Sequence, residues 1–408
     1  MLKYWVKYHH SIWSGLLLLI RTLAGFGAQK VIAIFYGPAG TTLFSHFQNF
    51  ITLFTQPIQD AVANGLINAF PKKSLKKNQV VGAAIILLIL IAFSSGLFLF
   101  INGQFGESMF DFGLQNWLVI IPSLLLFCFG LIVSAVYVIK KKLKLYLIII
   151  LVQWVIFFIS IFHFDFTLNV FLIYWLSIQS FFSILLIYPI HSYLKFNFKI
   201  EEKVINHFKQ FLLMALVIWL SSKWVNYFIR EFSVQEFGVI QTGFWQSLVR
   251  VSEAYRGLMI SFLFLTLYPF LSRKMENKEL VFGSLKKKYF YYCLISFGLL
   301  FVIFQFDELI LKTLYDEQYV EASSMFQFQI IGDFFAFMAF PFSIYLMASV
   351  HTKAYIITEL ISAIIFVTLI VFYSTIGIEI LVYAHIIRFV CYSILVGLVG
   401  IKKMRDAH

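Results

Sequence analysis

The sequence contains few charged residues, few cysteines and few prolines. Asp, Glu, Lys and Arg make up only 13% of its 408 residues, whereas they form about 25% of a soluble globular domain. Its three cysteines lie in separate apolar stretches, so they predict neither a disulfide framework nor a metal site. A P-loop, a nucleophile elbow and the HExxH and CxxC patterns are also missing. These absences argue against a soluble protein and against an enzyme, and they predict no metal and no cofactor.

What the sequence does contain is hydrophobic residues, which form 61% of the chain and give a mean hydropathy of +0.87. About 249 apolar residues would supply about twelve membrane helices of about 20 residues each. Helices are expected because a lone strand in lipid would leave its backbone groups unpaired. The predicted fold class is therefore an all-α polytopic membrane protein. Its twelve apolar stretches lie at about 11–36, 43–70, 79–101, 117–139, 145–163, 169–190, 208–229, 238–271, 289–305, 323–349, 354–375 and 378–400.

Lysine and arginine are concentrated in alternate connectors between these stretches. If the N-terminus is cytoplasmic, the connectors on that side hold 24 of the 32 basic residues, and the opposite connectors hold only Arg230 and Lys312. Cytoplasmic loops of membrane proteins are enriched in basic residues, so both termini are predicted to be cytoplasmic. This distribution accounts for the net charge of +12 without a basic face for nucleic acid.

The longest cytoplasmic connector, residues 191–207, follows the sixth apolar stretch. It predicts two six-helix lobes, residues 1–190 and 208–408, joined by a basic linker. Because six is an even number, the lobes share one orientation, as expected for parallel repeats. The first stretch is expected to be a retained span, since Arg21 interrupts it and no small-residue cleavage pattern follows.

Ten charged residues fall inside the apolar stretches. Such a charge snorkels to the headgroups, forms a structural ion pair or lines a cavity, and for single residues these alternatives stay open. The basic ones are Arg21, Lys30, Lys223, Arg250, Arg256 and Arg388, and the acidic ones are Asp60, Glu253, Asp333 and Glu359.

Polar residues in the second stretch share one helical face within about 80°. They are His46, Asn49, Gln56, Asp60 and Asn64. Such a stripe either forms hydrogen bonds between helices or lines a cavity. Pro57 lies within it and permits a bend.

The eighth stretch places Gln246, Arg250, Glu253 and Arg256 on one face. Glu253 lies three residues from each arginine and neutralises only one of them, so one excess positive charge is expected. Gln329 and Asp333 share a face in the tenth stretch, and His385, Arg388 and Tyr392 share one in the twelfth.

Together these charges predict a hydrated, net-positive cavity between the two lobes. Arginine suits a diphosphate because its fork binds phosphate oxygens in pairs. The acidic residues Asp60, Glu253 and Asp333 are predicted to form ion pairs or to couple a proton or sodium ion to transport. The predicted substrate-binding residues are Arg21, His46, Asn49, Gln246, Arg250, Arg256 and Arg388.

Four patches of the sequence resemble a known family. They are GFGAQKVIAIFYGPAGTTLFSHFQNFITLF, which continues to AVANGLINAF; LLMALVIWLSS; FWQSLVRVSEAYRGLMISFLFLTLYPFLSRKM; and FQFQIIGDFF. In these patches the chain resembles the Wzx-type flippases for lipid-linked oligosaccharides, of the multidrug/oligosaccharidyl-lipid/polysaccharide exporter (MOP) superfamily. The likeness is strongest to the flippases for lipid III of enterobacterial common antigen and for O-antigen.

The resemblance implies a V-shaped, MATE-like fold of two lobes in the bacterial inner membrane. It implies that an undecaprenyl-diphosphate-linked glycan, of the kind used for enterobacterial common antigen or lipopolysaccharide, moves from the cytoplasmic to the periplasmic leaflet by alternating access. Membrane lipids, a polysaccharide polymerase and a chain-length regulator are the implied partners.

Two other functions remain open. A cation-coupled multidrug antiporter of the same fold would have an acidic cavity, whereas the apolar stretches here contain six basic and four acidic residues. A membrane polymerase or ligase would carry a large external loop, and every predicted external connector is short. The order of preference is flippase, antiporter and enzyme.

Overall fold

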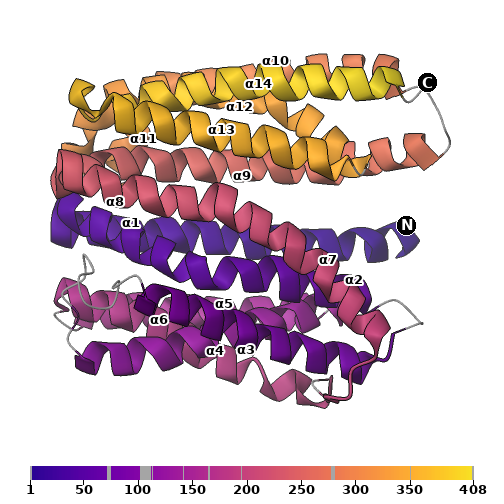
Figure 1. The fold of residues 1–408 in the computed structure, drawn as a ribbon. Coiled ribbons are helices and arrows are strands. Elements are labelled where there is room, and N and C mark those ends of the chain that lie inside the picture. Colours follow the sequence, from indigo (N-terminus) through magenta and orange to yellow (C-terminus); the bar gives the residue numbers. More distant parts are fainter. Residues whose placement is uncertain are drawn as a thin grey trace. The chain divides into compact units, whose positions relative to one another are not determined.

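The computed structural model describes residues 2–70, 75–101, 112, 114–140, 142–163, 166–193, 195–276, 281–349 and 351–406. In these ranges the chain is built from helices joined by short connections (Figure 1). The chain divides into two compact units. Unit 1 holds residues 1–28 and 43–227, and unit 2 holds residues 29–42 and 228–408. This division differs from the predicted lobes, because a short piece of the first helix joins unit 2 and residues 208–227 stay with unit 1.

Unit 1 is organised around α4 and α6, which pack along each other. The π-helical segment η1 contacts α3, α4 and α7, so it lies inside the bundle. The elements of this unit are α1 (Leu2–Pro57, except its residues 29–42), η1 (Ile58–Ala63), α2 (Asn64–Ala69), α3 (Lys77–Ile101), α4 (Leu114–Ile139), α5 (Leu143–His163), α6 (Leu168–Leu185), η2 (Tyr188–Tyr193), α7 (Glu202–Ile218), η3 (Trp219–Trp224) and the start of α8 (Val225–Phe237).

Unit 2 is organised around α12, which contacts α9, α10, α13 and α14. Figure 1 shows α12, α13 and α14 running alongside one another. Beyond α1 residues 29–42 and the rest of α8, the unit holds α9 (Val239–Glu276), α10 (Val281–Gln305), α11 (Asp307–Leu314), η4 (Glu317–Ala322), α12 (Ser323–Ala348), α13 (Thr352–Phe372), η5 (Ser374–Ile376) and α14 (Ile380–Asp406).

Each of the twelve predicted spans coincides with a helix, and the predicted all-α, multi-pass class is confirmed. Within the described ranges, eight helices are long and apolar enough to cross a membrane by themselves. One reason the number is below twelve is that α1 joins two predicted spans. The helices of the seventh and eighth predicted spans are not among the eight, and α9 carries Arg250, Glu253 and Arg256.

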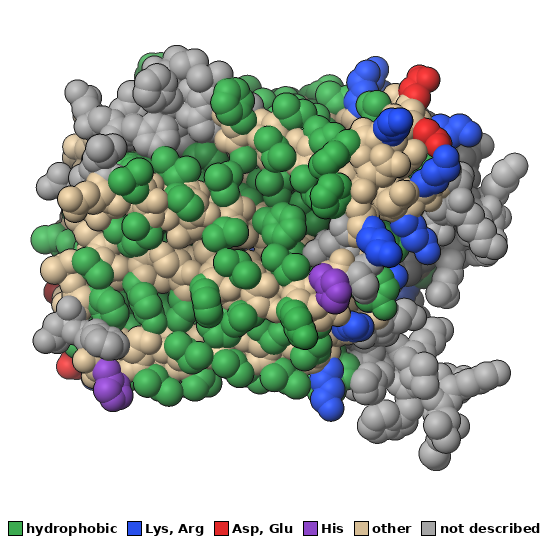
Figure 2. Space-filling model, turned by 90° about the horizontal axis from the view of Figure 1, so that it is seen from below, with side chains coloured by type: hydrophobic (Ala, Val, Ile, Leu, Met, Phe, Trp, Pro, Cys, Tyr) green, Lys and Arg blue, Asp and Glu red, His purple; other side chains and the backbone are tan. Residues whose placement is uncertain are grey.

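The surface has the character expected of a membrane protein. Large apolar side chains are widely exposed, among them Phe93 at 69%, Leu118 at 68% and Phe162 at 73%. Figure 2 shows hydrophobic side chains across the middle of the visible face, with lysine and arginine gathered towards one end of the helices. Such a face suits hydrocarbon chains in its middle and headgroups at its basic end.

The predicted linker packs against the start of α3. The backbone N–H of Asn197 donates to the carbonyl of Asn78 over 2.9 Å, and the Lys76 ammonium lies 2.6 Å from the Glu201 carboxylate. The hydrogen bond from Lys76 lowers the pKa of Glu201 from its ordinary value. Glu201 is therefore ionised at neutral pH, and the linker is held to α3 by a solvent-exposed pair.

The predicted turn between the first two spans is a sharp kink. The two helical parts of α1 meet at Gly37, whose φ of 63° and ψ of −162° are readily adopted only by glycine. The tip of this helical hairpin, residues 29–42, belongs to unit 2. Thr42 donates to the carbonyl of Val239 over 2.6 Å, and Thr41 shares a hydrogen bond of 2.5 Å with Tyr319.

Replacing Gly243 in α9 by alanine is expected to displace this tip. An added Cβ would clash with the carbonyl oxygen of Pro38, a backbone atom with little freedom to move. Overpacking of this kind costs about 1–3 kcal/mol. Gly257→Ala on the same helix is the matched control, because its Cβ would meet nothing within 4 Å. Thermal unfolding of the purified variants should show a lower Tm for Gly243→Ala only, and equal Tm values would contradict the packing.

Candidate functional site

A cluster of three charged residues lies where α8 meets α9. Glu253 is 3.3 Å from Arg250, one turn earlier on α9, and 3.6 Å from Arg230 on α8. The side chain of Arg230 is only 5% exposed, whereas those of Arg250 and Glu253 are 35% and 33% exposed. Two arginines therefore share one carboxylate, and the pair on α9 reaches the surface of unit 2.

This arrangement corrects the predicted role of two residues. Arg230 was assigned to an external connector, but α8 continues to Phe237 and buries the Arg230 guanidinium in the cluster. Glu253 was expected to neutralise Arg250 or Arg256, but its second partner is Arg230. Both guanidinium groups, of Arg230 and of Arg250, therefore lie against the Glu253 carboxylate. No pattern in the sequence predicted that Arg230 lies beside Glu253, because the two residues belong to different helices.

Asp333 on α12 forms the centre of a second network. Its carboxylate is fully buried and lies 3.4 Å from Arg256 and 3.0 Å from Nε2 of His385 on α14. The hydroxyl groups of Ser252 and Tyr255 on α9 also donate to it, the first over 2.5 Å. Arg256 therefore pairs with Asp333, on a different helix, and not with Glu253. Sequence reasoning missed Ser252 and Tyr255, because only the packing of α9 on α12 brings them to the carboxylate.

Gln329 lies one turn before Asp333 on the same face, as expected from the sequence. Its amide nitrogen is 2.9 Å from Nε2 of His385 and 3.3 Å from the hydroxyl oxygen of Ser252. The same imidazole nitrogen thus faces both a carboxylate and an amide. It donates when it carries a proton and accepts when it does not, so the network can hold a proton in more than one position.

The close approach of α12 to α14 depends on Gly332. A Cβ at this position would clash with Cδ2 of His385. Gly332→Ala is therefore expected to push His385 away from Asp333 and to lower the stability by about 1–3 kcal/mol. Gly298→Ala on α10 is the control, since its Cβ would meet nothing within 4 Å. Equal unfolding temperatures for the two variants would show that this packing is unimportant.

Arg388 lies in a third group, between α13 and α14. Its guanidinium donates to Ser362 over 3.0 Å and stacks 5.0 Å from the centre of the Phe366 ring. Tyr392, one turn later, donates to Glu359 and shares a hydrogen bond of 2.7 Å with Ser343. His385, Arg388 and Tyr392 were expected to share one face of α14. The Phe389 ring joins this group to the Asp333 network, because it lies 5.1 Å from Arg388 and 5.7 Å from Arg256. Arg388 is not in direct contact with Arg250 or with Asp333 in any interaction that the structure shows.

Gln246 occupies the start of the predicted stripe on α9. Its side chain is 1% exposed, and among the described residues neither amide atom has a hydrogen-bond partner. An unpaired amide at membrane depth is costly. Gln246 is one turn before Arg250, so it stays in the set of predicted substrate-binding residues.

In unit 1 the predicted residues are dispersed. Arg21 is exposed on α1 and donates to the hydroxyl of Tyr146 on α5. His46 is buried, with its ring 4.8 Å from that of Tyr227. Asn49 is half-buried, and among described residues its Nδ2 has no hydrogen-bond acceptor. Arg21 therefore lies apart from the polar stripe, whereas His46 and Asn49 remain on it.

Asp60 lies in the π-helical segment η1, directly after Pro57. Gln56 donates to its carboxylate over 2.8 Å, and the positive charge of Lys223, in the second π-helical segment η3, acts on it. A π-segment changes the angle between successive residues. The predicted 80° stripe therefore does not continue past Pro57 as a regular face, and Asn64 is exposed while His46 is buried.

Comparison with known proteins gives a fold and a weak sequence relationship. No protein-family model matches the chain. The MATE-family transporter of the MOP superfamily in its inward-facing conformation superimposes with a TM-score of 0.76 over 95% of each chain, at 12% identity. Its outward-facing conformation superimposes with a TM-score of 0.70 over 97% of this chain and 95% of that transporter, at 12% identity. The bent form of the Vibrio cholerae transporter VcmN superimposes with a TM-score of 0.62 over 98% of both chains, at 14% identity.

The curated relatives include the lipid III flippases of Escherichia coli (strain K12) and Shigella flexneri. Each is 22% identical over 168 residues, which span 41% of this chain and 40% of the relative. The chain thus matches about two fifths of the length of these relatives. The resemblance to lipid-linked oligosaccharide flippases of the MOP superfamily is supported by them. The chain therefore has the fold of MATE-family transporters and several helices long and apolar enough to cross a membrane.

Proposed function

We propose that this transporter flips an undecaprenyl-diphosphate-linked oligosaccharide from the cytoplasmic to the periplasmic leaflet of the bacterial inner membrane. The observation that carries the proposal is the partly exposed Arg250–Glu253 pair, with the Arg230 guanidinium 3.6 Å from the same carboxylate. The named relatives, which are lipid III flippases, support the substrate class.

The depth of Arg250 matters to this argument. It lies eleven residues after Val239, where α9 begins, or about 16 Å along the helix axis. If α9 enters the hydrocarbon core, which is about 30 Å thick, at its first residue, this position is near the middle of the core. A charge at that depth is too costly to face lipid chains and instead faces water or protein. Because Arg250 is 35% exposed, we infer that it faces a hydrated path.

The charge of the cluster favours a substrate that carries negative charge. The three networks described above hold four arginines, Arg230, Arg250, Arg256 and Arg388, and three carboxylates, Glu253, Asp333 and Glu359. Arginines thus outnumber carboxylates in these networks, and the partly exposed cluster holds two arginines and one carboxylate. A diphosphate offers several oxygens to a guanidinium fork. A cationic drug would be repelled, which makes the multidrug antiporter the less favoured function.

We also propose that the coupling ion is a proton, carried by Asp333 and His385. Every partner of the Asp333 carboxylate that the structure shows is an N–H or O–H donor. Sodium needs several oxygen ligands with free lone pairs, and donors directed at the carboxylate occupy the space that it would need. Asp60 keeps its predicted role as an ion-coupling or ion-pair residue.

The proposal is tested by complementation of bacterial strains that lack their own lipid III or O-antigen flippase. Restored surface glycan, with loss of the accumulated lipid-linked unit from the cytoplasmic side, is the expected result. Absence of export for every glycan tested, with normal protein in the membrane and export of cationic drugs, would reject the proposal in favour of an antiporter.

A further inference from the structure

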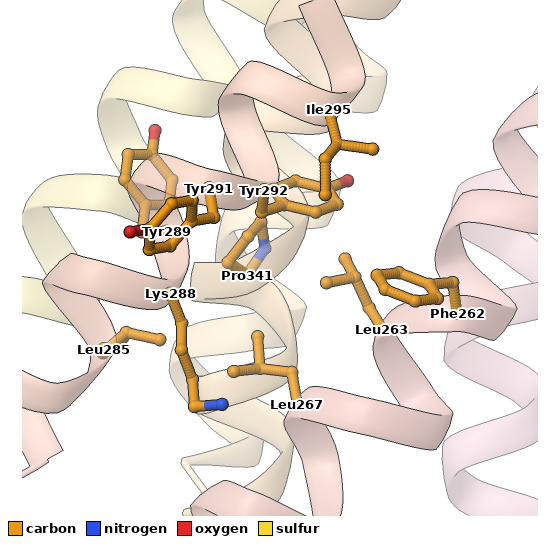
Figure 3. Close-up of a pocket in the computed structure, with 10 residues that line it drawn as sticks. All are labelled: Phe262, Leu263, Leu267, Leu285, Lys288, Tyr289, Tyr291, Tyr292, Ile295 and Pro341. Atoms are coloured by element: carbon orange, nitrogen blue, oxygen red, sulfur yellow. The ribbon is translucent and has the colours of Figure 1, made fainter. Parts of the chain in front are cut away.

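A second candidate site lies within unit 2, away from the charged networks. It is a pocket of about 250 Å³ between α9, α10 and α12. Hydrophobic and aromatic side chains line it, and among the described lining residues only Lys288 is charged. Figure 3 shows Lys288 at one end of the pocket, beside Leu267, and Ile295 at the other end. The pocket therefore has a positive end and an apolar end.

The pocket opens on a surface that suits lipid. Around it, Phe262 on α9 is 45% exposed, and Tyr291 and Ile295 on α10 are each 54% exposed. Exposed apolar side chains of this kind on a membrane helix face hydrocarbon chains. Pro341 of α12 forms part of the wall, and it has no backbone N–H to donate within the helix.

The position of Lys288 along α10 fixes the direction of the ligand. Lys288 is exposed and lies near the start of α10, after Lys286 and Lys287 in the sequence, and its ammonium is 4.4 Å from the centre of the Phe270 ring. Ile295 lies seven residues later, about 10 Å further along the helix. An amphiphile with its anionic group at Lys288 would thus place its chain along α10, towards the middle of the membrane.

We propose that this pocket binds an anionic phospholipid, with its phosphate at Lys288 and one acyl chain between Leu267 and Ile295. The charge complementarity carries the assignment, since basic residues between membrane helices at the cytoplasmic side recognise anionic headgroups. The basic run at the start of α10 is predicted to be cytoplasmic, where the headgroups of that leaflet lie. Lipid bound here would fill the space between α9, α10 and α12 and stabilise unit 2.

The test is native mass spectrometry of the detergent-solubilised protein with added dioleoyl phosphatidylglycerol or dioleoyl phosphatidylethanolamine. The wild type is expected to retain phosphatidylglycerol preferentially. Lys288→Gln should weaken its binding about fivefold, whereas Lys286→Gln should not, because Lys286 is exposed on the same helix but does not line the pocket. Equal binding by the wild type and Lys288→Gln would overturn the proposal.

Two further measurements separate the alternatives. Leu267→Trp should fill the pocket and remove phosphatidylglycerol binding while leaving the Tm of the lipid-free protein within a few degrees, and retained binding would count against the pocket. Dihexanoyl phosphatidylglycerol, which has the headgroup but short chains, should compete poorly. Undecaprenyl phosphate should not displace bound phosphatidylglycerol. If it does so at equimolar concentration, the pocket holds the isoprenoid carrier and the phospholipid assignment is wrong.

Discussion

Replacing Arg250 by glutamine is expected to abolish glycan export while leaving the protein folded in the membrane. Arg250 is partly exposed, and Glu253 keeps Arg230 as a partner when Arg250 is neutral, so little stability should be lost. A hydrogen-bonded charge pair with a diphosphate contributes about 1.5–3 kcal/mol, which corresponds to a loss of binding of about tenfold to a hundredfold. Export of the lipid-linked glycan in a complemented strain is the measurement.

Two matched variants make this result specific. Arg250→Lys keeps the charge but loses the paired donors of the guanidinium, so it should retain part of the export. Lys312→Gln removes a basic residue that lies in α11 and pairs with Glu317 at 2.7 Å, and it should export normally. Normal export by Arg250→Gln, with protein levels matched, would show that the exposed cluster is not the anion site.

Asp333→Asn is expected to have the largest effect on stability. The change leaves Arg256 without its carboxylate partner, in a network where Asp333 is fully buried. Removal of one member of a buried ion pair costs about 3–5 kcal/mol. The unfolding temperature of the purified protein should fall steeply, and export should be lost.

The double variant Asp333→Asn/Arg256→Gln separates structure from coupling. Removing both charges should recover much of the stability, since no unpaired charge is then buried. Export should remain absent, because the proton site at Asp333 is lost. Recovery of export together with stability would assign a purely structural role to Asp333. Export that depends on sodium and not on the pH gradient in the wild type would contradict the proposed proton coupling.

The sequence predicted the helices well because their signal is local. Each of the twelve apolar stretches overlaps a helix, and the turn at Gly37 was visible as a glycine and proline pair. The stripe on α9 was also visible, because the spacing of Arg250, Glu253 and Arg256 is a property of one helix. Helical periodicity therefore identified which residues share a face.

The partners of those residues could not be predicted in the same way. Arg256 pairs with Asp333, 77 residues away, and Glu253 pairs with Arg230 from a segment expected to be a loop. Both pairings depend on how α9 packs on α8 and α12, which no single-helix pattern contains. The π-helical segment at Asp60, which directly follows Pro57, was equally hidden, because the apolar pattern does not distinguish a π-segment from an α-helix.

The most direct test of the central claim is translocation in reconstituted vesicles. Purified protein would be placed in liposomes with a labelled undecaprenyl-diphosphate-linked glycan, and the label exposed outside would be measured with an added glycosidase. Wild-type protein should move the glycan across the bilayer at least tenfold faster than Arg250→Gln, and faster still under an imposed pH gradient. Equal rates for the wild type, Arg250→Gln and protein-free vesicles would contradict the account.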